Sequence, residues 1–220
     1  MYFFNKKLSL GCRSSDYGRN NWAESELLED AEAYRQFRAS HDGCTFVDTH
    51  CHIDFMFNNM RYGRSWKSFK EDYQRTFPPS FEACIADFCD PALYADESET
   101  FWETLLRDSP DIWGAFGVHP HCADQWNEEV RQTLQARCLH PRVVAVGEMG
   151  LDYSHRNNVS HDIQKRVFRE QLHLAFDVDK PIVIHCRDAE DDCLDILLEE
   201  CHKVNSGLGQ IRSKEEMIRG

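Results

Sequence analysis

The 220-residue sequence carries 38 acidic and 25 basic side chains, which gives a formal net charge of −13, and 41% of its residues are hydrophobic. This composition is typical of a globular protein with a real core, and it excludes disorder over the whole chain. The acidic balance also argues against a broad basic surface that grips nucleic acid through many phosphates. A phosphate-bearing substrate must therefore be held locally, for which a bound divalent cation can supply the positive charge.

The sequence shows no sign of membrane insertion or export. Its longest uncharged apolar runs, such as 143–146 and 182–184, are far shorter than the roughly 20 residues of a membrane-spanning helix. The first residues place their charge after an apolar patch, the reverse of a secretory signal, and the ten cysteines contain no C-x-x-C pair. We expect an intracellular chain with reduced thiols, in the nucleus or the cytoplasm and without a membrane partner.

The composition and hydrophobic pattern of the sequence change twice along the chain. Residues 1–43 are polar and acidic with one helical stretch at 24–38, which predicts an N-terminal extension. Residues 44–203 alternate short apolar runs with helical segments and form the predicted main domain. Residues 204–220 are polar again and are predicted to be a divergent tail.

Five apolar runs of the main domain have the length and residue types of strands. They lie at 45–48, 83–88, 113–118, 143–147 and 181–185, and predicted helices lie at 128–139, 162–178 and 188–201. This alternation predicts βαβ units and a parallel sheet.

Each of these five runs ends in polar residues of catalytic type. They are Asp48, His50 and His52, then Asp87 and Asp90, His119 and His121, Glu148 and Asp152, and finally His185 and Arg187. Parallel α/β folds place their active sites at the carboxyl ends of the strands, because the loops that leave the strands converge there. The sequence therefore predicts an active site at this edge of the sheet.

The pair His50 and His52 is a candidate for binding a transition metal, with two surface histidines as the alternative. Asp48 beside them is expected to orient an imidazole. Glu148 and His185 add ligand-type side chains at the ends of later strands of the same predicted sheet. Three strand ends that carry ligands favour the metal site.

Four segments in order, FVDTHCHID, GAFGVHPH, VAVGEMGLDY and KPIVIHCR, resemble the TatD family of metal-dependent deoxyribonucleases. The resemblance covers roughly residues 44–203. It implies an α/β fold of the (β/α)8 TIM-barrel type and the hydrolysis of phosphodiester bonds in DNA. It also implies two divalent metal ions, Mg²⁺ with Mn²⁺ or Zn²⁺ as alternatives. Single-stranded DNA or 3′ ends are the expected substrate, with RNA as the alternative.

The resemblance also implies a role for individual residues. The metal ligands would be His50, His52, Glu148 and His185, with Glu148 bridging both ions as the catalytic carboxylate. His119, His121 and Arg187 would face the substrate phosphate, and Asp152 is expected to fix its loop. A glutamate at position 148, where related small-molecule amidohydrolases bridge with a modified lysine, favours the nuclease.

The sequence departs from the family in its length. A complete (β/α)8 domain takes about 250 residues, and we find only about five βα units before the tail. One histidine and one aspartate of the family's ligand set have no counterpart. We therefore expect a barrel truncated after about five units and activity well below that of a complete barrel. The alternative function is an inactive fragment that acts as a binding or regulatory partner.

An aromatic stretch with interspersed basic residues follows the first motif. It comprises Phe55, Phe57, Trp66, Phe69, Tyr73 and Phe77, with Arg61, Arg64, Lys67 and Lys70. We expect these aromatic side chains to pack against the domain, with contact to a single nucleic-acid strand as the alternative. Two further histidines, His155 and His161, are expected to be surface residues of a polar loop.

Overall fold

The structure, a computed structural model, describes residues 45–94 and 101–203. The described residues divide into two compact units, the first made of 45–88, 92–94, 101–115 and 141–144, and the second of 89–91, 116–140 and 145–203. The predicted N-terminal extension, with its helix at 24–38, and the predicted tail at 204–220 lie outside the described residues. Within the described ranges, no helix is long and apolar enough to cross a membrane.

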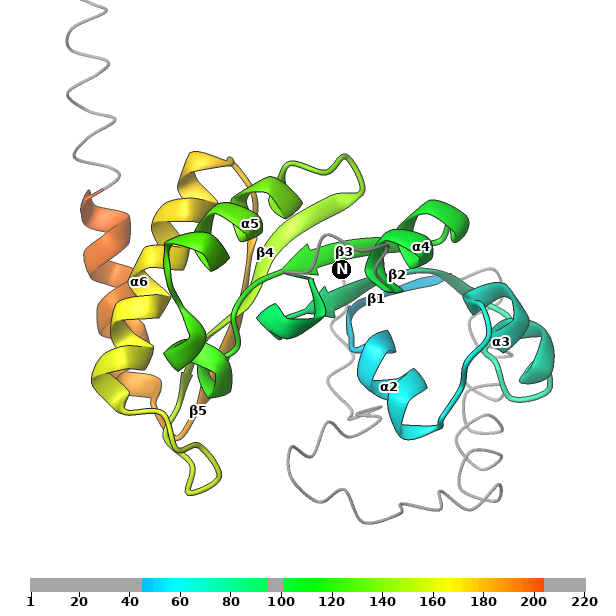
Figure 1. The fold of residues 1–220 in the computed structure, drawn as a ribbon, viewed down its shortest axis with the longest axis horizontal. Coiled ribbons are helices and arrows are strands. Elements are labelled where there is room, and N and C mark those ends of the chain that lie inside the picture. The colour runs from blue at the N-terminus through cyan, green and yellow to red at the C-terminus, as the bar shows by residue number, and fades with distance from the viewer. Residues whose placement is uncertain (1–44, 95–100, 204–220) are drawn as a thin grey trace, which may run out of the picture. The chain divides into compact units, whose positions relative to one another are not determined.

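The strands form one sheet whose order follows the sequence, β1-β2-β3-β4-β5 (Figure 1). They are β1 (Phe46–Cys51), β2 (Phe81–Phe88), β3 (Ile112–Phe116), β4 (Val143–Asp152) and β5 (Ile182–Arg187). β1 pairs with β2, and β4 pairs with β5, in parallel. A strand order that follows the sequence, with helical connections, is that of a (β/α)8 barrel. The expected fold class, a TIM-barrel type represented by five strands, is confirmed.

Helices and short turns connect these strands. They are α2 (Ile53–Asn59), α3 (Trp66–Asp72), η1 (Pro91–Leu93), α4 (Phe101–Asp108), η2 (Pro120–Gln125), α5 (Glu128–Cys138) and α6 (His161–Asp177), followed by a helix over 190–203. α5 and α6 begin where the side chains of Asn127 and Ser160 accept a hydrogen bond from the backbone of the first turn. The predicted helices at 128–139 and 162–178 are confirmed to within two residues at each boundary, and the predicted helix at 188–201 is confirmed with its start at 190.

β4 continues to Asp152, further than the sequence predicted, so Glu148 and Asp152 lie within the strand rather than after it. Gly147 and Gly150 explain the difference, because both have a φ of 144° and both lie directly against β5. A Cβ atom at Gly150 would overlap the carbonyl oxygen of His185. Glycine at these positions therefore brings the carboxyl ends of β4 and β5 together.

Replacement of Gly150 by alanine is expected to lower the free energy of unfolding by at least about 1 kcal/mol, because it adds overlap to an unfavourable φ. Gly63→Ala is the matched control, since a Cβ there would meet nothing within 4 Å. It is expected to change the free energy by less than about 0.5 kcal/mol. Urea unfolding of both variants measures the difference, and equal midpoints would contradict the role given to Gly150.

The aromatic stretch forms the core of the first unit. Phe57, Trp66 and Phe69 are buried, and their ring centroids lie 5.3–6.4 Å apart. The indole N–H of Trp66 donates to the carboxylate of Asp111 at 3.1 Å. The expected packing of these rings is confirmed. Phe55 differs from them, since its ring lies 5.3 Å from that of His52.

Two buried glutamines of α6 fix the strand ends of the second unit. The amide of Gln171 accepts from the backbone N–H of Val118 at 2.7 Å and donates to its carbonyl at 3.1 Å. Gln164 accepts from the backbone N–H of Asp152 at 2.8 Å. These contacts satisfy backbone groups that would otherwise lack a partner and so hold the segments that carry His119 and Asp152.

Candidate metal centre and phosphate site

In the first unit, β1 carries His50, and His52 follows it as the residue that caps α2. Nδ1 of His52 lies 3.2 Å from the backbone carbonyl oxygen of Asp87. A carbonyl only accepts, so in the neutral ring Nδ1 carries the proton and Nε2 keeps its lone pair. This is the protonation state of a histidine that ligates a metal through Nε2.

The side chain of Asp87 orients the other histidine, His50. Its Nδ1 lies 3.3 Å from Oδ2 of Asp87, whose carboxylate is 0% exposed. A carboxylate at this distance favours a proton on Nδ1, although the contact lacks the geometry of a hydrogen bond, and Nε2 is then the ligand atom of His50. The two histidines therefore fit a divalent cation, because ligating imidazoles usually donate their other N–H to a carboxylate or a carbonyl.

Two carboxylates lie near His50. Asp48, which the sequence predicts to orient an imidazole, accepts from the backbone N–H of His50 through Oδ1 at 3.1 Å. Asp87, near the end of β2, lies against the imidazole of His50. An aspartate inside an apolar run was the signal available in the sequence, since a buried carboxylate needs a polar partner.

In the second unit, Glu148, His185 and His119 converge, and their ligand-type atoms all lie within 4.8 Å of one another. Nδ1 of His185 lies 3.0 Å from Oε1 of Glu148, which is 8% exposed. Burial disfavours a charged His185, but the carboxylates of Glu148 and Asp152 together outweigh it and raise the pKa of His185. The pair of Glu148 and His185 fits a divalent cation, which would replace the Nδ1 proton between them.

Asp152 fixes the opposite nitrogen of His185. Its Oδ2 lies 3.2 Å from Nε2 of His185 and 2.9 Å from Nε2 of His121, and its Oδ1 accepts from the backbone N–H of Ser154 at 2.9 Å. Burial alone would raise the pKa of Asp152, but the hydrogen bonds from Ser154 and His121 lower it to about 2. Asp152 therefore remains a carboxylate that orients both imidazoles.

His119 has the opposite protonation state from the ligand-type histidines. Its Nδ1 accepts from the backbone N–H of His121 at 3.1 Å, so in the neutral ring the proton is on Nε2. Nε2 lies 3.3 Å from Nδ1 of His185. Burial, together with the neighbouring His185, lowers the pKa of His119 to about 3, which keeps it neutral. His119 is therefore an N–H donor aimed at the Glu148 and His185 pair.

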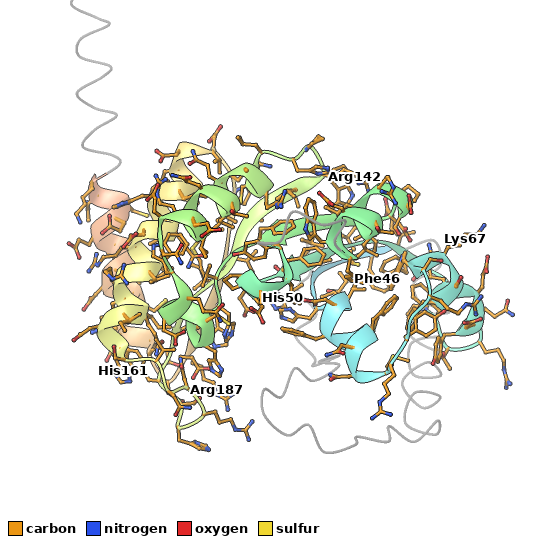
Figure 2. The ribbon with its side chains drawn as sticks, in the orientation of Figure 1. Phe46, His50, Lys67, Arg142, His161 and Arg187 are labelled. Carbon is orange, nitrogen blue, oxygen red and sulfur yellow. The ribbon has the colours of Figure 1, made fainter. Side chains whose placement is uncertain are left out.

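The structure thus brings five of the predicted site residues into one network in the second unit, namely His119, His121, Glu148, Asp152 and His185. His121 donates its Nε2 proton to Asp152. Arg187 is exposed as the last residue of β5 (Figure 2). His50 and His52 share Asp87 in the first unit.

The sequence matches the TatD-related DNase family over residues 47–209. The chain belongs to this family. It is 43% identical over 152 residues to human "3'-5' RNA nuclease TATDN2", covering 69% of this chain and 19% of the relative. It is 34% identical over 137 residues to "3'-5' ssDNA/RNA exonuclease TatD" of Yersinia pseudotuberculosis, covering 62% of this chain and 52% of that one.

A solved structure shows the same fold. It is that of the TatD homologue YJJV from Escherichia coli, with a TM-score of 0.54 and 25% identity over 71% of this chain and 56% of the other. The TatD-family chain thus spans about half the length of YJJV and of the Yersinia relative, and a smaller part of human TATDN2.

Proposed function

We propose that this TatD-family chain contributes the ligands and phosphate contacts of a metal-dependent nuclease that hydrolyses phosphodiester bonds in single-stranded DNA, with RNA as the alternative. The observation that carries the proposal is the set of partners around the histidine nitrogens. Partners on Nδ1 leave His50 and His52 with Nε2 as the ligand atom, and Asp152 on Nε2 of His185 leaves Nδ1, beside Glu148, as the atom from which a cation would displace the proton. The names of the two relatives, an RNA nuclease and an ssDNA/RNA exonuclease, support the substrate class.

The proposed ligands are His50, His52, Glu148 and His185, with Glu148 as the catalytic carboxylate shared by two ions. Divalent ions, Mg²⁺ by preference and Mn²⁺ or Zn²⁺ as alternatives, would activate a water molecule and offset charge on the attacked phosphate. Imidazole and carboxylate together form a donor set that suits such ions. Asp87 and Asp152 hold the imidazoles in orientation.

His119 and Arg187 are the proposed phosphate contacts. The neutral His119 offers Nε2–H as a donor in a fixed direction, since the backbone of His121 holds its other nitrogen. A fixed hydrogen-bond donor of this kind stabilises the negative charge that develops on a phosphate oxygen in the transition state. Arg187 adds a guanidinium, a group that can form two parallel hydrogen bonds with two oxygens of one phosphate. His121 is also proposed to face the phosphate, and its ring is oriented by the hydrogen bond from Nε2–H to Asp152.

A 5′-labelled single-stranded DNA and an RNA of the same sequence, incubated with the purified chain, test the proposal. We expect stepwise shortening in Mg²⁺ and none in EDTA. Cleavage that persists in EDTA would contradict the metal-dependent mechanism. Binding without cleavage would favour the second candidate, a binding or regulatory partner without turnover.

Asp87→Asn is expected to lower the affinity for Mn²⁺ by about 10- to 100-fold, because an amide accepts the Nδ1 proton of His50 less strongly than a carboxylate. Asp48→Asn is the matched control. In the described part of the chain, the hydrogen bond of the Asp48 carboxylate is to the backbone N–H of His50 and not to its imidazole. This control variant is expected to change the affinity less than about threefold. Calorimetric titration compares the two, and equal losses would remove the role given to Asp87.

A further inference from the structure

The loop between β4 and α6 lies next to the proposed site and carries a stacked pair that the site does not use. Tyr153 follows Asp152 directly, and its ring is parallel to that of His161, with centroids 3.6 Å apart and an interplanar angle of 9°. Tyr153 is half-buried, whereas His161, the first residue of α6, is exposed. One ring is therefore seated in the fold, and the other offers a face to the solvent.

One side-chain hydrogen bond and one backbone hydrogen bond hold Tyr153 in place. The Tyr153 hydroxyl donates to Oδ2 of Asp192 at 2.6 Å, and the same oxygen binds Nζ of Lys165 at 2.6 Å. The backbone N–H of Tyr153 donates to the carbonyl of Arg187 at 2.9 Å. The fixed Tyr153 ring gives His161 a preset surface to stack on, which lowers the conformational entropy lost when a ligand stacks on His161.

The same loop is tied to the strand end that carries the histidine network. The side-chain amide of Asn157 donates to the carbonyl of Asp152 at 3.0 Å, and that of Gln164 donates to the carbonyl of Val159 at 2.8 Å. A contact made on His161 is therefore held at a constant position relative to Asp152. This is the property that a substrate subsite beside the proposed phosphate site needs.

The loop itself carries a basic side chain and no acidic one. Residues 153–161 read YSHRNNVSH, in a chain whose net charge is −13, while Asp152 and Asp162 flank the segment and Asp192 accepts from Tyr153. The basic residue is Arg156, and Figure 2 shows His161 and Arg187 at the same end of the second unit. An aromatic face beside basic side chains is the usual combination for binding single strands, since every base has a face that can stack.

We propose that Tyr153 and His161 form a nucleobase-stacking subsite, in which the exposed face of His161 receives the base of a nucleotide that flanks the phosphate held by His119 and Arg187. This inference rests on the proposed function and adds to it a contact with single-stranded nucleic acid that does not depend on base identity. A base that stacks on His161 orients the strand without taking part in the chemistry.

Binding of a fluorescent single-stranded DNA to the full chain, in Ca²⁺ and with the oligonucleotide checked to be intact, tests the subsite. His161→Ala is expected to weaken binding about 5- to 100-fold, and His161→Phe, which keeps a stacking face, to restore it to within about threefold. His155→Ala, the matched control at an exposed histidine of the same loop, is expected to change binding less than about twofold.

A second probe separates stacking from other effects. A series of oligonucleotides, each with one abasic nucleotide at a different position of the strand, is used for this. At one of these positions, the loss of the base is expected to remove the difference in binding affinity between the parent and His161→Ala. A difference that persists at every position, or equal losses for His161→Ala and His155→Ala, would overturn the subsite. So would a chain that does not bind the DNA at all. Binding with these effects but without cleavage in Mg²⁺ would leave the subsite standing and would contradict the nuclease instead.

Discussion

Glu148→Gln is expected to lower the turnover of single-stranded nucleic acid by more than about a hundredfold. Glu148 is buried beside His185, and its carboxylate is the only group assigned to both ions. The amide keeps the size of the side chain but removes its charge and one anionic ligand oxygen. The loss should therefore persist at saturating Mg²⁺, because the assigned role concerns charge in the reaction as well as affinity.

His155→Ala is the control for this prediction, since His155 is exposed in the loop after β4 and has no assigned role in the site. We expect its rate to stay within about twofold of the parent. The comparison takes the initial rate of cleavage at several Mg²⁺ concentrations. A Glu148→Gln variant that recovered most of the parent's rate at high Mg²⁺ would show that Glu148 is not the bridging residue.

His119→Ala is expected to reduce turnover by about a hundredfold at saturating Mg²⁺, because it removes a fixed N–H donor from the phosphate site. The effect should lie mainly in kcat, since the donor is worth most where charge develops. His119→Gln carries an N–H donor on a side chain of similar reach and should recover part of the rate. An unchanged kcat in His119→Ala would contradict the donor role.

The sheet could be predicted from the sequence because its signals are local. Each of the five apolar runs overlaps a strand, and the polar residues at their ends form the networks around Asp87 and Asp152. The end of β4 could not be predicted in the same way. It depends on how closely Gly147 and Gly150 let β5 approach, a contact made more than 30 residues later in the chain.

The histidines, too, could be predicted only in part from the sequence. Their residue type and position predicted a metal site, but the protonation of each ring depends on a partner that the spacing of a motif does not reveal. Nδ1 of His52 faces the backbone of Asp87, whereas Nδ1 of His119 accepts from the backbone of His121. His161 is exposed, as expected, but it begins α6 and stacks on Tyr153 rather than lying in a loop.

The proposed site depends most on the division between ligand histidines and the donor histidine, and a paired calorimetric titration with Mn²⁺ tests this division directly. His185 and His119 offer ligand-type atoms to the same group, within 4.8 Å of one another, so proximity alone does not distinguish them. We predict that His185→Ala lowers the affinity for Mn²⁺ at least about tenfold, whereas His119→Ala leaves it within about threefold of the parent. If His119→Ala weakens Mn²⁺ binding as severely as His185→Ala does, His119 is a ligand and the division is wrong.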